Sequence, residues 1–169
     1  ASENLEEEAL KTSLQNITGN GYTALSYNNA RDQMFMTIDN QKLNGQGTTQ
    51  NTIECVYTGR LAVGYTSRSD CQSNYSFNNE HTYPQSLFVS NTPMVSDLHH
   101  LFPTDDNANG VRSNYPFGIA TNVSWTQGGS KFDNTTNIFE PRDQHKGETA
   151  RAMLYFVVRY QNYGNFLNS

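Results

Sequence analysis

Residues able to do acid–base or metal chemistry gather in one part of the chain. Three of the four histidines lie within 20 residues of each other, and two carboxylates accompany them: His81, His99, His100, Glu80 and Asp97. Imidazoles and carboxylates in one place can hold a metal ion or exchange protons with a substrate. A hydrogen-bonded structural cluster uses the same residue types, so composition alone leaves both interpretations open.

The residue types favour a hard cation over zinc. The chain has neither a Cys-x-x-Cys pair nor a His-Glu-x-x-His string, which are the usual spacings of zinc sites. Carboxylate and amide oxygens suit Mg²⁺ or Ca²⁺. Mg²⁺ commonly keeps several of its waters, so one glutamate and one asparagine can hold it when a substrate phosphate supplies a further oxygen.

Two longer strings contain these residues, and a third follows them in the chain. They are residues 80–86 (EHTYPQS), 96–103 (SDLHHLFP) and 108–118 (ANGVRSNYPFG). In this order they resemble the signature segments of the bacterial endonuclease I family, whose members are secreted or periplasmic nucleases of the ββα-metal, or His-Me finger, type. The segment from residue 139 to residue 160 is also similar to the family, so the resemblance extends over residues 54–160.

The resemblance implies a role for each matching residue. His81 is the expected general base, which deprotonates the attacking water, and an imidazole with an ordinary pKa of about 6.5 suits that work. Glu80 and Asn109 are the expected ligands of one Mg²⁺, for which Ca²⁺ or Mn²⁺ could substitute. The implied reaction is hydrolysis of DNA, with RNA as a second candidate substrate, to 5′-phosphate and 3′-hydroxyl ends with little sequence preference.

Arg112 matches the arginine of the third string and is a candidate catalytic residue. Its planar guanidinium fits the oxygens of a scissile phosphate. The alternative is a structural ion pair with Asp97 or Glu140, and the sequence does not decide between the two. Glu140 is also expected to form a buried pair with Arg151, which would tie the C-terminal helix to the core.

The elements that position these residues are expected to form one α+β domain. No linker or repeat divides residues 1–169, and the ββα-metal core is expected at about residues 77–118, flanked by helices. The expected core consists of a strand ending near His81, a second strand over residues 98–103 and a helix that carries Asn109.

The adjacent positions of Glu80 and His81 impose a constraint. Neighbouring side chains of a regular strand point to opposite faces of the sheet, so these two could meet one phosphate from the same face only if the backbone were irregular there. Pro84, just beyond, is consistent with such an irregularity. The same alternation means that at most one of His99 and His100 faces the site, and each is expected to be structural.

Apolar spacing and turn residues predict further elements around this core. They are helices over residues 4–18, with Asn4 as the N-cap, and about 26–39, a strand over 53–65, a polar loop over 66–79 and a buried helix over 149–160. Cys55 and Cys71 would be either a disulfide or two buried thiols, and two cysteines do not decide which.

The net charge of -5 argues against a broadly basic nucleic-acid-binding surface. Four of the 16 acidic residues lie within the first eight positions, whereas six bases accompany four acids from residue 110 onward. The acidity is therefore concentrated far in sequence from the expected site. We expect a modest, salt-sensitive affinity for nucleic acid that rests on a local patch and the metal.

Other functional classes and the cellular location stay open at this point. A secreted carbohydrate-binding module, a nucleic-acid-binding domain without activity and a phosphodiesterase for small esters are the alternatives. The chain begins at Ala1 rather than Met, which together with the resemblance favours a secreted or periplasmic protein. No run approaches the ~18–20 apolar residues of a membrane span, so no membrane partner is expected and a monomer is the default.

Overall fold

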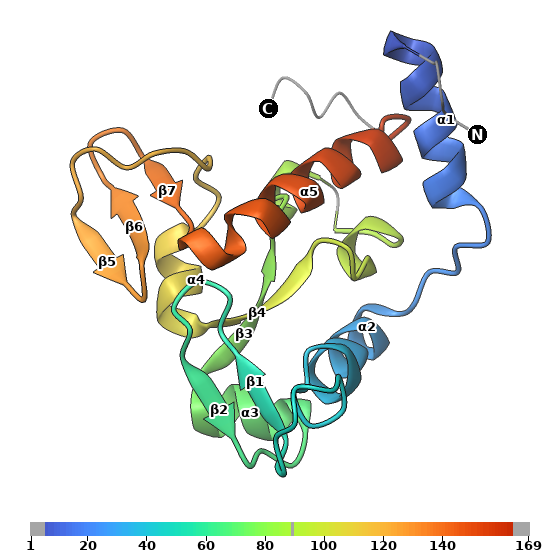
Figure 1. Cartoon of the computed structure of the whole chain (residues 1–169). Helices are drawn as coiled ribbons and strands as arrows, with labels where there is room; N and C mark the ends of the chain where they lie inside the picture. The colour runs from blue at the N-terminus through green and yellow to red at the C-terminus, as the bar shows by residue number, and fades with distance from the viewer. Residues whose placement is uncertain (1–5, 89, 164–169) are drawn as a thin grey trace.

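The structure, a computed structural model, describes residues 6–88 and 90–163. These residues form helices α1 to α5 and three small antiparallel sheets, which confirms the expected α+β class (Figure 1). None of the helices in the described ranges is long and apolar enough to cross a membrane.

A strand hairpin followed directly by a helix lies at the centre of the molecule. Strand β3 (Phe77–His81) pairs antiparallel with β4 (Leu101–Asp105), and α4 (Asp106–Arg112) begins at the next residue. The Asp105 carboxylate caps the helix by accepting a hydrogen bond of 2.8 Å from the Ala108 amide, as N-terminal aspartates commonly do. The expected order of strand, strand and helix is present, although the second strand begins three residues later than predicted.

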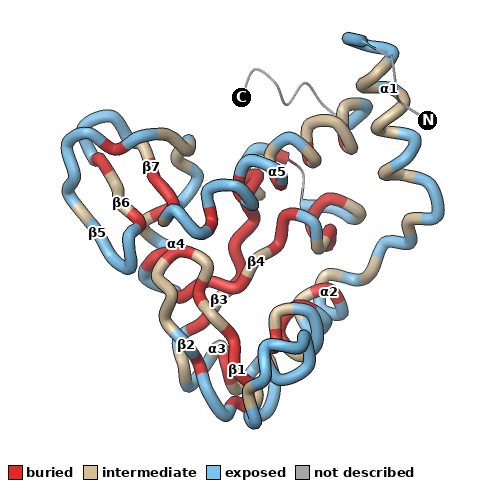
Figure 2. Tube along the Cα trace, viewed as in Figure 1, coloured by how far each residue is buried: buried red, intermediate tan, exposed pale blue. Residues whose placement is uncertain are grey.

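Helix α5 (Asp143–Arg159) packs one face against this centre and starts six residues earlier than expected. Its inner face includes Ala152 and Phe156, which are buried. On the outer face the Leu154 side chain is 66% exposed. The expectation of a wholly buried helix is therefore wrong: the helix is apolar around most of its circumference, but the described part of the chain covers only one side (Figure 2).

Two N-terminal helices flank the centre, as predicted. Helix α1 (Glu7–Gly19) packs against α5, and α2 (Tyr27–Gln33) continues into a π-helical turn over Met34–Ile38. The Ser26 hydroxyl caps α2 by accepting from the Asn29 amide. The expected N-cap of the first helix, Asn4, lies outside the described residues.

The single strand expected over residues 53–65 is wrong. The segment instead folds back on itself as β1 (Thr52–Glu54) and β2 (Leu61–Val63), which pair antiparallel. Gly59 supplies a positive φ of 73° in the intervening turn, a conformation that glycine adopts without strain. Because apolar residues flank the turn on both sides, the sequence pattern resembled one continuous strand.

The loop expected over residues 66–79 is also wrong, because it contains α3 (Arg68–Tyr75). The helix is polar and buries only Cys71, so it lacks the apolar periodicity that would reveal it. The Ser67 hydroxyl caps its start by accepting from the Asp70 amide. Cys71 and Cys55 are both buried free thiols, which settles the open question of a disulfide.

A third sheet follows α4 in the chain and consists of β5 (Trp125–Gln127), β6 (Ser130–Asp133) and β7 (Ile138–Glu140). Its β5–β6 turn meets the turn between β1 and β2. Gly128 has a φ of 59°, and a Cβ atom at this position would overlap the backbone of Thr58. Only glycine therefore allows this close approach between the two turns.

We predict that Gly128→Ala lowers the free energy of unfolding by roughly 3 kcal/mol, because it adds steric overlap to backbone strain. Gly45→Ala is the matched control, since Gly45 also has a positive φ, of 88°, but open space around it. The control is expected to lose only about 1 kcal/mol. Urea unfolding of both variants measures the difference, and equal losses would contradict the close approach.

Candidate active site

A cavity of about 480 Å³ opens at the end of β3. Three of the four residues with predicted site roles contribute to its wall: Glu80, His81 and Asn109. The other residues of the wall are nearly all neutral and polar; they are Tyr27, Asn78, Asn79, Pro84, Gln85, Ser86, Ser113 and Asn114. Strand β3 and helix α4 thus bring residues 80 and 109 to one place.

His81 is held with one ring nitrogen fixed and the other available. Its Nε2 lies 3.1 Å from the Val95 carbonyl oxygen. Because a carbonyl can only accept, Nε2 carries the proton, and the lone pair of a neutral ring then lies on Nδ1. Nδ1 has no hydrogen bond among the described residues. Burial, aided by the proximity of His100, lowers the pKa of His81 to about 4, so the ring is neutral at physiological pH.

Glu80 is a buried carboxylate with one oxygen occupied. The Tyr57 hydroxyl donates to Oε1 over 2.8 Å, and Arg112 Nε lies 3.2 Å from the same oxygen as an ion pair. Burial raises the pKa of Glu80 to about 7, against the opposing effects of the Arg112 charge and the Tyr57 hydrogen bond. The second oxygen, Oε2, has no hydrogen-bond partner in the described ranges, so it can serve as a metal ligand.

Arg112 supports Glu80 from behind the cavity. Its side chain is 1% exposed, and its two terminal nitrogens donate to the carbonyls of Thr82 and Ser113, each over 2.9 Å. The guanidinium also lies 4.1 Å from the centre of the Phe117 ring. Its acidic partner is Glu80, not Asp97 or Glu140 as the structural alternative held. Arg112 is not among the residues of the cavity wall.

The irregular backbone expected at Glu80 and His81 is not present. The pairing of β3 with β4 stays in register through both residues, with Glu80 opposite Phe102 and His81 opposite Leu101. Their side chains accordingly have different neighbours: Tyr57 and Arg112 for Glu80, Val95 and Tyr27 for His81. Both still line the cavity because it lies at the end of the strand.

The other two histidines of the cluster lie outside the cavity wall. His100 is buried, donates from Nε2 to the Met94 carbonyl over 2.7 Å, and has its ring 5.5 Å from that of His81. His99 is stacked on Tyr155 and bonds to Asp97 over 2.8 Å. Both histidines make contacts that hold the surrounding segments together, and neither lines the cavity.

The predicted buried pair between Glu140 and Arg151 is wrong. Glu140 pairs with Lys146 over 2.7 Å and with Lys131 over 3.5 Å, and it accepts from the Ala120 amide. Arg151 is exposed on the next turn of α5. Lys146, near the start of α5, is therefore the charged residue that links this helix to β7 through Glu140.

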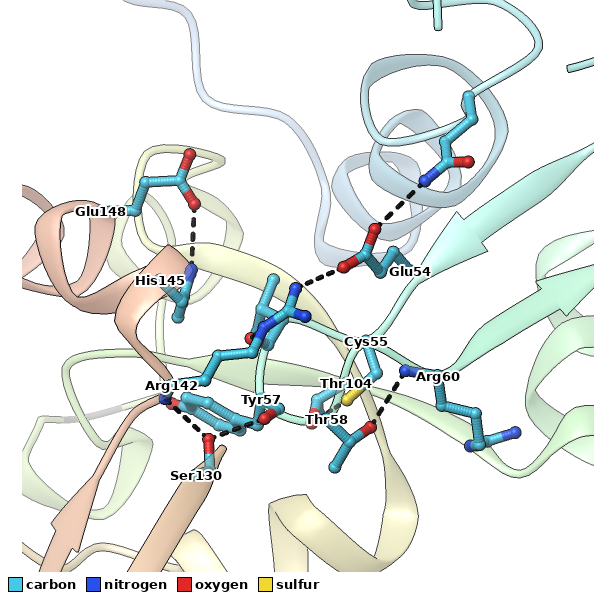
Figure 3. A network of polar contacts seen from close by, with 12 residues as sticks. Glu54, Cys55, Tyr57, Thr58, Arg60, Thr104, Ser130, Arg142, His145 and Glu148 are labelled. Atoms are coloured by element: carbon cyan, nitrogen blue, oxygen red, sulfur yellow. Dashed lines mark hydrogen bonds and ion pairs between the residues drawn. The ribbon is translucent and has the colours of Figure 1, made fainter. Parts of the chain in front are cut away.

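Tyr57, which the sequence did not indicate, is held in place by a polar network (Figure 3). Ser130 Oγ donates to the Tyr57 carbonyl over 2.7 Å and accepts from the Arg142 amide over 2.9 Å. The Arg142 side chain donates to the Val56 carbonyl over 2.8 Å and pairs with Glu54. The C-terminal part of the chain therefore fixes the residue that hydrogen-bonds Glu80.

Asp97 is a buried carboxylate that joins the segment before β4 to the C-terminal half of α5 and the residue after it. Its side chain is fully buried and accepts from His99, Tyr155 and Tyr160. Burial alone would raise its pKa, but these hydrogen bonds lower it to about 2, against an ordinary value of 3.8. Because the folded-state pKa is depressed, the stabilisation is fully present above about pH 4 and is lost as the pH falls toward 2.

We predict that Asp97→Asn removes roughly 2 kcal/mol of stability at pH 7 and flattens the acid dependence between pH 4 and 2. Asp106→Asn, at an exposed position in the first turn of α4, is the control and is expected to change stability by about 0.5 kcal/mol or less. Urea unfolding at several pH values measures both. An unchanged acid dependence in Asp97→Asn would contradict the assignment.

Comparison with known proteins identifies the family of the chain. The profile of the family described as Endonuclease I matches residues 6–167. An extracellular ribonuclease of Bacillus amyloliquefaciens is 30% identical over 158 residues, and one of Bacillus subtilis (strain 168) is 28% identical over 159. These alignments cover 90% and 91% of this chain but 50% of each relative, so the chain spans about half their length. Because the family match covers nearly all of its residues, the chain belongs to the Endonuclease I family.

Proposed function

We propose that this protein is a secreted, Mg²⁺-dependent endonuclease that hydrolyses phosphodiester bonds of DNA and RNA with little sequence preference. The products would carry 5′-phosphate and 3′-hydroxyl ends. The observation that carries the proposal is the neutral His81, with Nδ1 available, in one cavity with Glu80 and Asn109. Relatives described as extracellular ribonucleases support both secretion and a nucleic-acid substrate.

In this mechanism His81 is the general base. Nδ1 accepts a proton from the attacking water, while the Val95 carbonyl keeps the ring in place through Nε2. The ring remains hydrogen-bonded when it becomes an imidazolium, because Nε2 donates in both states. The ring is already neutral at physiological pH and can accept the proton, but a pKa of about 4 makes it a weaker base than the ordinary imidazole expected from the sequence.

Glu80 and Asn109 are the residues that would hold the metal. The Asn109 side chain has no hydrogen bond among the described residues, and Oε2 of Glu80 is likewise available. No group of three or more His, Cys, Asp or Glu in the described ranges could hold a metal ion, and one carboxylate with one amide suits a cation that keeps most of its waters. A bound Mg²⁺ supplies charge stabilisation to the phosphoryl and leaving oxygens.

The lack of lysine and arginine in the described cavity wall supports both the metal requirement and the lack of sequence preference. No lysine or arginine is among the residues of the wall that the structure describes. A phosphate entering the cavity therefore meets amide and hydroxyl groups, which bind the backbone without reading bases. A carbohydrate-binding module would not need Glu80 and His81 together at the cavity. Comparing the hydrolysis of nucleic acid with that of a small ester would distinguish a nuclease from a phosphodiesterase for small esters.

We predict that His81→Ala reduces Mg²⁺-dependent cleavage of a supercoiled plasmid at least about a hundredfold, because the water loses its base. EDTA is expected to stop the wild type. The control is His99→Ala, which removes a histidine outside the cavity and is expected to keep most activity. Residual cleavage by a folded His81→Ala protein above about a tenth of wild type would exclude the base role.

We predict that Glu80→Gln and Asn109→Ala each raise the Mg²⁺ concentration for half-maximal cleavage by about tenfold or more, because each removes or weakens one ligand. Asn107→Ala is the matched control, since Asn107 is exposed on the same helix and outside the cavity wall. Titration of activity with Mg²⁺ measures the change. Unchanged titration curves for both ligand variants would refute the assignment.

A further inference from the structure

A second hollow, of about 860 Å³, adjoins the catalytic cavity. Pro84 and Asn114 belong to the walls of both, and the Asn114 amide donates to the Ser86 hydroxyl over 3.4 Å at this boundary. The two hollows therefore share part of their walls. The second hollow, here called the apolar groove, runs from the segment after α4 to the first half of α5.

The apolar groove exposes large hydrophobic side chains to water. Ile119 is 78% exposed and Leu87 is 41% exposed, and both line the groove. Tyr115 and Phe117 add aromatic rings, each with one face already covered, by the Phe132 ring at 4.9 Å and the Arg112 guanidinium at 4.1 Å. Apolar surface of this extent beside a catalytic cavity is typical of a binding site for a flat, partly apolar group.

We infer that the apolar groove binds the nucleobase of a nucleotide next to the scissile phosphodiester, so that unpaired strands are the preferred substrate. This inference rests on the proposed nuclease function. A base lies one sugar away from its phosphate, and the groove lies directly beside the cavity that takes the phosphate. A base held in a duplex is stacked and paired, and it can enter such a groove only after leaving the stack.

The polar groups of the groove suit a nucleotide of any sequence. Its charged lining residues, Arg112 and Lys146, are both cations, and no carboxylate lines it. The Thr149 side chain is 4% exposed, and its hydroxyl has no hydrogen-bond partner among the described residues. A hydroxyl both donates and accepts, but this one is buried, so it reaches a base edge only if the side chain turns toward the groove.

Filling the groove separates this inference from the proposed function. Ala150 is exposed on α5 and lines the groove, so Ala150→Trp places an indole in it without disturbing the core. Leu154→Trp is the control, because Leu154 is 66% exposed on the same helix and outside the groove. A second test, the double variant Leu87→Ser and Ile119→Ser, removes exposed apolar surface and does not depend on the added indole.

The substrates are a single-stranded oligonucleotide, the same strand with one abasic nucleotide, and its duplex. For the wild type we expect about tenfold higher kcat/KM on the single strand than on the duplex, and about tenfold slower cutting beside the abasic nucleotide. Both differences should shrink to about twofold or less in Ala150→Trp and in the double variant. Leu154→Trp should behave as the wild type.

A wild type that cuts all three substrates equally would overturn the inference while leaving the nuclease function intact. Groove variants that discriminate among the three substrates as the wild type does would also overturn it. If light scattering then shows that these variants differ from the wild type in oligomeric state, the groove would be assigned to a second copy of the chain. A wild type that cuts none of the three, with Mg²⁺ present, would instead refute the proposed function.

Discussion

The candidate site depends on a carboxyl group held inside the protein, and burial raises the pKa of this group, Glu80, to about 7. Glu80 is 3% exposed, and burial alone would favour its protonated form. Arg112 and Tyr57 oppose that effect from one side, and both act on the same oxygen. Arg112 is itself buried and needs the Thr82 and Ser113 carbonyls to satisfy its nitrogens. One buried charge therefore requires hydrogen bonds from several segments.

The two oxygens of Glu80 have separate functions in this arrangement. Oε1 is bonded to Tyr57 and Arg112, whereas Oε2 has no hydrogen-bond partner among the described residues, and Asn109 on α4 lines the same cavity as Glu80. Because α4 begins at the residue after β4, no intervening loop separates the strand hairpin from the helix. The relative position of the two candidate ligands is thus set by strand pairing and by the Asp105 cap.

The central unit could be predicted because its residues lie in long, ordered strings. Residues 80, 81 and 109 meet in one cavity, as expected, and the strand–strand–helix order is correct. The role of Tyr57 could not be predicted, since it lies in a turn whose flanking apolar residues resembled a continuous strand. The polar helix α3 had no apolar stripe, and the partner of Arg112 was not apparent, because a buried ion pair depends on distances between segments remote in sequence.

The close contact between the β5–β6 turn and Thr58 has a consequence for how the candidate site could lose its support. The same sheet supplies Ser130, whose hydroxyl holds the Tyr57 carbonyl. Local opening of β5 to β7 would release Tyr57 and withdraw a hydrogen bond from Glu80 while the β3–β4 hairpin remained paired. Glu80 can therefore lose part of its hydrogen-bond support through the three-stranded sheet, even though β3 carries it.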